Sequence, residues 1–205
     1  MRVLSLLAAM LFGLAGLPAL AQAPPDGTPT AVRGNVEKLD GQSLTVKPKE
    51  GPPVTITLAA NFTVAGVAKR SLADIKPGDY VATNSIKGTD GQLHAIEMHI
   101  FPEAMKAAVT EGQRPSSLVQ GGLMTNAFVV EVSEAPQGRL LKGKWKDGTI
   151  DTLVEPDAPI VTYVPGDPSL LQPGAAVVIF ALKKPDGSLT AARVTAEKDG
   201  VKPPM

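Results

Sequence analysis

The chain has 205 residues, with 20 lysines and arginines, 20 aspartates and glutamates, and no cysteine. The balanced charge provides no basic surface for neutralising phosphates, so the sequence argues against a nucleic-acid partner. Without cysteine, disulfides and thiol chemistry are excluded, although small exported domains often depend on disulfides. Aromatic side chains make up only 4% of the residues, which leaves few stacking platforms for sugars or single-stranded nucleic acids.

The N-terminus has the three parts of a secretory signal peptide. Arg2 supplies a positive start, residues 3–14 form an apolar run, and small residues at 19–23 provide a cleavage site. The apolar run is shorter than the roughly 20 residues that span a membrane, and no later stretch is long enough. We therefore expect a signal peptide over residues 1–23, export to the periplasm or beyond, and no integral membrane span after cleavage.

A short sequence motif occurs twice in the rest of the chain and indicates an internal repeat. Residues 75–81 read IKPGDYV and residues 171–177 read LQPGAAV, a shift of 173 − 77 = 96 residues. The same shift carries DGQLHA at residues 90–95 onto DGSLTA at residues 186–191. Repeated turns at one constant spacing are typical of one structural unit that is used twice.

The repeat extends beyond these turns. It needs no gap from Ala31, opposite Ala127, to Pro102, and it places Leu44 opposite Leu140. Within each copy, valine, isoleucine and threonine alternate with polar residues, and turn signals recur every eight to twelve residues. This pattern predicts an all-β fold of two similar small barrels in tandem, of the oligonucleotide-binding or SH3-like kind.

The segment between the copies has no repeat partner. Residues 103–110 are good helix formers, so we expect a partly helical connector. The predicted organisation, in chain order, is a signal peptide (1–23), an extended leader (24–30), a first β-barrel repeat (31–100), the connector (101–126), a second β-barrel repeat (127–198) and a tail (199–205).

Both histidines of the chain, His94 and His99, fall on the last strand of the first repeat. Strict alternation divides this strand into one face with Ile96, Met98 and Ile100 and another with Leu93, Ala95, Glu97 and His99.

This division predicts that Glu97 and His99 point outward together, with Glu103 just beyond the strand. Imidazole and carboxylate groups suit Zn²⁺ or a similar divalent cation, so these three residues are the candidate metal ligands. The alternative is a solvated surface strand, because three ligands do not fill a tetrahedral shell. No other cofactor is indicated.

Catalytic signatures are missing from the sequence. It contains neither a G-x-S-x-G elbow nor an H-E-x-x-H helix, and nothing in the pattern brings two carboxylates together for glycoside cleavage. We assign no catalytic residue and expect a non-enzymatic protein.

Several phrases are similar to a known family. They are HIFPEAM at residues 99–105, MTNA at 124–127, PIVTYVPGD at 159–167, and KDGVKPPM at 198–205. These phrases resemble an uncharacterised family of exported bacterial proteins with a domain-of-unknown-function label, sometimes annotated "metal ABC transporter permease". The resemblance implies a metal-related neighbourhood and no established activity. The chain departs from the family pattern at residues 113–117, where QRPSS stands in place of His-Arg-Pro-Trp-Asp.

Three functions remain open from the sequence. The leading one is a binding or scaffolding module of the bacterial cell envelope, which uses the groove between the barrels or the connector to contact an envelope protein or a small ligand. The alternatives are a periplasmic metal-binding accessory protein, using Glu97, His99 and Glu103, and an envelope hydrolase of unrecognised type.

Overall fold

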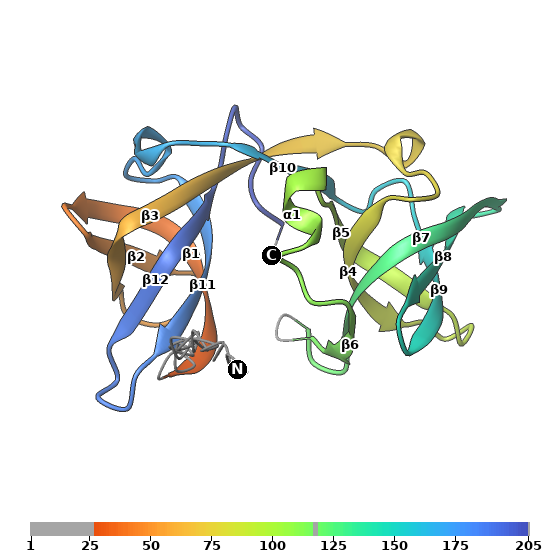
Figure 1. Ribbon diagram of the computed structural model, residues 1–205, viewed down its shortest axis with the longest axis horizontal. Helices are drawn as coiled ribbons and strands as arrows, with labels where there is room; N and C mark the ends of the chain where they lie inside the picture. The colour runs from red at the N-terminus through yellow and green to blue at the C-terminus, as the bar shows by residue number, and fades with distance from the viewer. Residues whose placement is uncertain (1–26, 117–118, 205) are drawn as a thin grey trace, which may run out of the picture.

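The computed structural model describes residues 27–116 and 119–204, and nearly all of its regular structure is β-strand (Figure 1). The all-β prediction is therefore confirmed. The expected signal peptide lies outside the described residues. No helix within the described ranges is long and apolar enough to cross a membrane.

The elements before the connector are β1 (Thr28–Asp40), β2 (Ser43–Pro48), β3 (Val54–Arg70), the 3₁₀ turn η1 (Leu72–Asp74), β4 (Tyr80–Lys87) and β5 (Leu93–Ile100). The connector contains α1 (Glu103–Lys106) and β6 (Gly112–Pro115). The elements after it are β7 (Leu123–Ala135), β8 (Gly138–Trp145), β9 (Gly148–Val154), β10 (Ile160–Pro165), the 3₁₀ turn η2 (Pro168–Leu170), β11 (Ala176–Lys183) and β12 (Leu189–Ala196). The connector is thus one helical turn and an unexpected short strand.

The strands close into two rings that lie side by side in Figure 1. In the first ring, β12, β11, β1, β2 and β3 follow one another, and β12 returns to β3. In the second ring, β5, β4, β7, β8 and β9 follow one another, and β9 returns to β5. Each ring therefore takes strands from both copies of the repeat, and the self-contained tandem barrels that the repeat predicts do not form.

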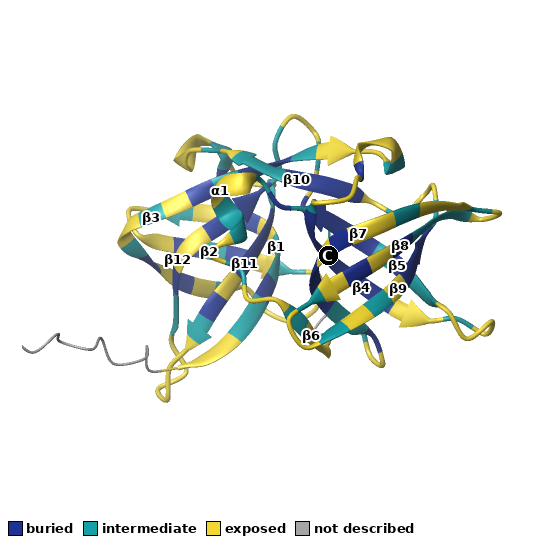
Figure 2. Ribbon diagram, turned by 45° about the vertical axis from the view of Figure 1, so that its right-hand side comes forward, coloured by how far each residue is buried: buried dark blue, intermediate teal, exposed yellow. Residues whose placement is uncertain are grey.

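The reason for this exchange lies in β3. It continues for 17 residues without a turn, which at about 3.3 Å per residue carries the chain roughly 56 Å. The strand leaves the first ring and pairs antiparallel with β10, which in turn pairs with β5. Figure 2 shows that β10 is buried in its first part, where it crosses between the rings. The strands that follow β3 consequently join the other ring.

The pairing registers reveal the duplication in three dimensions. β12 runs parallel to β3 with Leu189 opposite Ile56, and β5 runs parallel to β9 with Leu93 opposite Thr152. The differences, 189 − 93 = 96 and 152 − 56 = 96, equal the sequence repeat. Where β3 meets β10, Val67 lies opposite Tyr163, and 163 − 67 is again 96. The two halves are thus related by an approximate two-fold axis through this pair.

One part of the sequence alignment is wrong. The backbone of Val36 exchanges hydrogen bonds with Gly174 and Ala175, whereas Val129 does so with Gly78 and Asp79. Because 174 − 78 is 96 but 129 − 36 is 93, β1 and β7 are related by a shift of 93 residues. The difference is absorbed in the hairpins that follow these strands.

The β2 strand also departs from the 96-residue alignment, by one residue in the opposite direction, because 141 − 44 is 97. Leu44 pairs with Ile56, and Leu141 pairs with Thr152. Leu141, and not Leu140, is therefore the equivalent of Leu44. The side chains of Leu44 and Leu141 are both buried, so the repeat conserves the core position while the hairpin length changes.

Each ring encloses its own apolar core. In the first ring the buried side chains include Val36, Leu44, Ile56, Ile179 and Val194. In the second ring they include Val81, Met98, Val129, Leu141 and Val154. A third cluster lies outside the second ring, where the connector covers Tyr80, Ala82 and Phe101 with Met105 and Val109.

The exchanged strands predict how the protein responds to cleavage in the connector. A protease site inserted at residues 117–118 lies between α1–β6 and β7, and cutting there breaks no strand pairing within either ring. Because each ring holds strands from both fragments, we expect the cut protein to elute as one species under native conditions and as two in denaturant. Separation of two folded fragments without denaturant would contradict the exchange.

Candidate functional site

The first candidate site is a buried polar cluster on the outer face of β4 and β5. Glu97 is 3% exposed and His99 is 8% exposed, so the alternative of a solvated surface strand is wrong. Ile96 has no opposite residue on β4, because Asn84 pairs with Glu97 and Ser85 with Ala95. This β-bulge places an extra residue in β5 and shifts the alternation.

The bulge changes which side chains share a face. Ala95 and Met98 both belong to the core of the second ring, whereas strict alternation places them on opposite faces. Glu97 and His99 do share the outer face, as predicted. They are buried there because the connector and Tyr163 cover this part of the sheet.

Hydrogen bonds link the connector to Glu97. The hydroxyl of Ser116 donates to Asn84 Oδ1 over 2.7 Å, and Asn84 Nδ2 donates to Glu97 Oε1 over 2.6 Å. His99 Nε2 lies 3.9 Å from the same Glu97 oxygen, and the His99 ring stacks on Tyr163 with 5.3 Å between centroids. The cluster therefore ties residues from the connector, β4, β5 and β10 together.

Burial controls the protonation of this cluster. Desolvation raises the pKa of Glu97 to about 7, although the hydrogen bond from Asn84 and the charge of Arg33 oppose the rise. Burial likewise lowers the pKa of His99 to about 4. Between these two values both side chains are uncharged in the folded protein, so the cluster is a neutral hydrogen-bonded network over most of that range.

Three buried polar atoms of the cluster, Glu97 Oε2, His99 Nδ1 and Arg33 Nε, have no hydrogen-bond partner within the described part of the chain. Arg33 belongs to β1 in the first ring, whereas Glu97 belongs to the second. The positive charge of Arg33 acts to lower the pKa of Glu97.

The third predicted metal ligand does not join the cluster. The Glu103 side chain is 88% exposed and forms an ion pair of 2.7 Å with Lys106. Over residues 27–116 and 119–204, no three His, Cys, Asp or Glu side chains are grouped so that they could hold a metal ion. The structure thus brings Glu97 and His99 together and leaves Glu103 in solvent.

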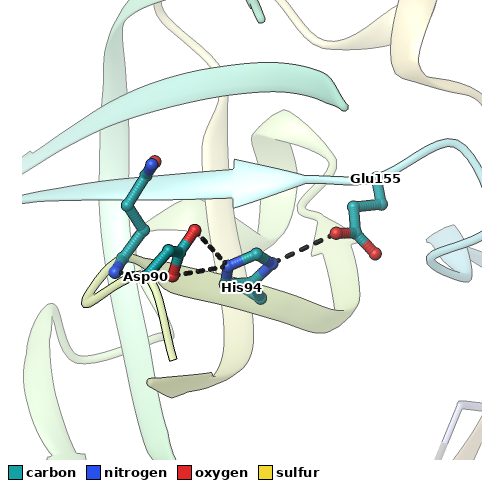
Figure 3. A network of polar contacts seen from close by, with 4 residues as sticks. Asp90, His94 and Glu155 are labelled. Atoms are coloured by element: carbon teal, nitrogen blue, oxygen red, sulfur yellow. Dashed lines mark hydrogen bonds and ion pairs between the residues drawn. The ribbon is translucent and has the colours of Figure 1, made fainter. Parts of the chain in front are cut away.

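The other histidine, His94, lies between two carboxylates (Figure 3). Its Nε2 is 3.1 Å from Asp90 Oδ2, and its Nδ1 is 3.1 Å from Glu155 Oε1. The hydrogen bond with Asp90 and then that with Glu155 raise the pKa of His94. Both ring nitrogens are engaged, so His94 links β5 to the loop after β9. No sequence pattern indicates this contact, because Glu155 lies 61 residues from His94 in the chain.

The second candidate site is an uncovered region on the first ring. The equivalents of Ala82 and Asn84 on β4 are Val178 and Phe180 on β11, at a shift of 96. Phe180 is 64% exposed, whereas Asn84 is 2% exposed. A groove of about 650 Å³ runs past Phe180 between β3, β11 and β12. The connector covers the face of the second ring that corresponds to this open face.

Glu97 generates a pH-dependent prediction. A folded pKa near 7 against an ordinary value of 4.5 means that the folded state favours the protonated acid. Glu97 therefore contributes stability below about pH 4.5 that is lost as the pH rises to about 7. We compare the free energy of unfolding of Glu97→Gln with that of the wild type at each pH. We expect this difference to favour the variant by about 2–3 kcal/mol more at pH 8 than at pH 4.

Chemical unfolding of both proteins at the two pH values measures this difference. His99 is present in both proteins, so its own titration cancels. Glu103→Gln serves as the matched control, because that carboxylate is exposed, and it should show no such change. Equal stability of Glu97→Gln and the wild type at every pH would contradict the assignment.

His94 generates a second pH-dependent prediction. Its raised pKa means that the imidazolium is stabilised in the folded state, and this stability is complete below the ordinary value of 6.5 and lost as the pH rises through the folded pKa. We expect His94→Gln to lower the melting temperature most at pH 6 and progressively less at pH 8 and 9. Asp90→Asn and Glu155→Gln should each reproduce part of the effect, and a pH-independent loss would refute it.

Comparisons with family models, with curated proteins and with solved structures found no match to this chain.

Proposed function

We propose that this protein is a non-enzymatic binding or scaffolding module of the bacterial cell envelope, exported to the periplasm or beyond, and that its first ring carries the contact surface. The partner is an envelope polypeptide. The expected signal peptide supports the location. The observation that carries the proposal is the unequal covering of two equivalent sheet faces.

Because the chain is duplicated, equivalent positions on the two rings can be compared directly. On the second ring, Met105 and Val109 of the connector pack over Tyr80 and Ala82. On the first ring, Val178, the equivalent of Ala82, is also buried, but Phe180, the equivalent of Asn84, is 64% exposed. Large exposed aromatic side chains beside a groove are typical of interaction sites. The connector covers this face on the second ring. On the first ring, the region around Phe180 is the proposed contact surface for a partner.

The groove beside Phe180 has a suitable chemical character. Val178, Phe180 and Leu182 provide apolar surface along β11, and Arg193 on β12 adds a positive charge. An apolar floor with a polar rim matches the composition of protein interfaces. A partner with an apolar anchor and a nearby carboxylate would complement this surface.

A metal-binding accessory role has weaker support. Glu97 and His99 each keep one buried atom without a partner in the described ranges, but they supply two ligands and Glu103 is not available as a third. A thermal-shift series with Zn²⁺, Cu²⁺, Mn²⁺ and Ni²⁺ tests this alternative. A rise in melting temperature that disappears in His99→Ala would favour it over the scaffold.

Site-specific photo-crosslinking in the native envelope tests the proposed function. A photoreactive residue at Phe180 should capture one constant, identifiable partner. The same residue at Val130, which is 45% exposed on the second ring, should not capture it. With the purified partner, Phe180→Ser should weaken binding by about tenfold or more, while the melting temperature stays unchanged because the side chain is exposed.

Equal capture at positions 180 and 130 would contradict the proposed surface. Absence of any constant partner at position 180 would contradict the scaffold role itself.

A further inference from the structure

The N-terminal part of β1 has an open edge. On one side, residues 28–35 pair with β11. On the other side, pairing with β2 begins only at Gly34. No described strand pairs with residues 28–33 on this second side. Such an edge offers unpaired backbone groups to another extended chain.

The direction of the free groups follows from the neighbouring hydrogen bonds. The N–H of Val36 donates to Ala175 and its C=O accepts from Gly174, so both groups point to the side of β11. Backbone groups alternate in direction along a strand. Those of Ala31 and Arg33 therefore point toward the open side, where they are available to an added strand.

The second half of the chain shows the same edge already occupied. There β6 pairs antiparallel with β7, with Gly112 opposite Asn126 and Arg114 opposite Met124. At the shift of 93 residues, Asn126 and Met124 are the equivalents of Arg33 and Ala31. The connector thus adds a strand to the very positions of β7 that remain open on β1.

The open edge borders the exposed aromatic side chain. Ala31 lies directly opposite Phe180 on β11, just as Met124 lies opposite Asn84 on β4. A strand added beside Ala31 would place one side chain of every two on the outer face next to Phe180. An apolar residue at that position would extend the exposed aromatic surface into a continuous contact.

The charge around the edge specifies what the added strand carries. A groove of about 820 Å³ beside β1 is lined by Arg33, Lys49 and Lys183, with Glu50 as its only carboxylate. In the second half, Glu111 stands immediately before β6, and its carboxylate accepts a hydrogen bond from the N–H of Lys146 in the turn after β8. The corresponding turn after β2 contains Lys49. An acidic residue ahead of the added strand fits this arrangement.

We infer that the open edge of β1 is a strand-addition site for an extended partner segment that carries acidic residues ahead of alternating apolar residues. The segment pairs antiparallel with Ala31 and Arg33, as β6 pairs with β7. This inference rests on the proposed scaffold function and specifies how the partner is held. Main-chain hydrogen bonds supply the affinity, and the outer-face residues beside Phe180 supply the specificity.

A second copy of the chain is a less suitable occupant. Two β1 edges in antiparallel contact would bring two copies of Arg33 into the same groove, which already contains Lys49 and Lys183. Like charges placed across a strand pair are destabilising. Concentration-dependent dimerisation, lost in Ala31→Pro, would identify this occupant and overturn the inference.

The test uses the exported full-length chain and a synthetic peptide in which two glutamates precede alternating valine and threonine. Fluorescence anisotropy measures binding of the peptide and of two derivatives that carry N-methyl groups on alternate amides. In one derivative the methyl groups face β1, and in the other they face solvent. We expect the first frame to weaken binding at least tenfold and the second to leave it unchanged. Equal binding of both derivatives would overturn strand addition.

Two variants of the protein complete the experiment. Ala31→Pro removes the N–H that points to the open side and leaves the pairing with β11, so it should abolish peptide binding. Ala31→Val keeps the N–H and serves as its matched control. A peptide with lysines in place of the glutamates should bind at least tenfold more weakly.

Undiminished peptide binding by Ala31→Pro, or no binding by the wild type, would overturn the inference. These failures are distinct from failure of the scaffold function. If crosslinking from Phe180 persists in Ala31→Pro, the scaffold surface stands and strand addition is wrong.

Discussion

The fold depends on the uninterrupted course of β3 through its pairing with β10. These two strands place each half of the chain across the other, so that neither ring can close with strands from one half alone. The pairing of Val67 with its own equivalent, Tyr163, shows that the contact is symmetric. In a domain-swapped dimer, two identical chains exchange strands in this symmetric way. Here the two halves of one chain exchange them, and the connector joins the halves.

The connector breaks this symmetry and thereby gives the two rings different surfaces. It covers the outer face of β4 with Met105 and Val109, adds β6 to the edge of β7, and anchors Ser116 to Asn84. The cost of burying Glu97 and His99 is reduced because both lose their charge there. Within residues 27–116 and 119–204, no strand is added to the corresponding edge of β1, and Phe180 stays exposed.

Predictions from the sequence were most accurate for features that depend on residues close together in the chain. The alternating segments of valine, isoleucine and threonine do form strands. Glu97 and His99 lie on the same face of β5, although both are buried there. The bulge at Ile96 was not visible, because an extra residue in a strand leaves no mark on composition and shifts the alternation by one.

The β-rich character of the chain and its 96-residue repeat could be predicted from the sequence alone. These properties follow from residue preferences, turn signals and periodicity, which act over a few neighbouring residues. Which copy supplies each strand depends on long-range pairing, because both copies present equivalent edges and alternation does not identify a partner. The tertiary structure also determines that Glu97 and His99 are buried while Phe180 is exposed, since burial depends on where the connector packs.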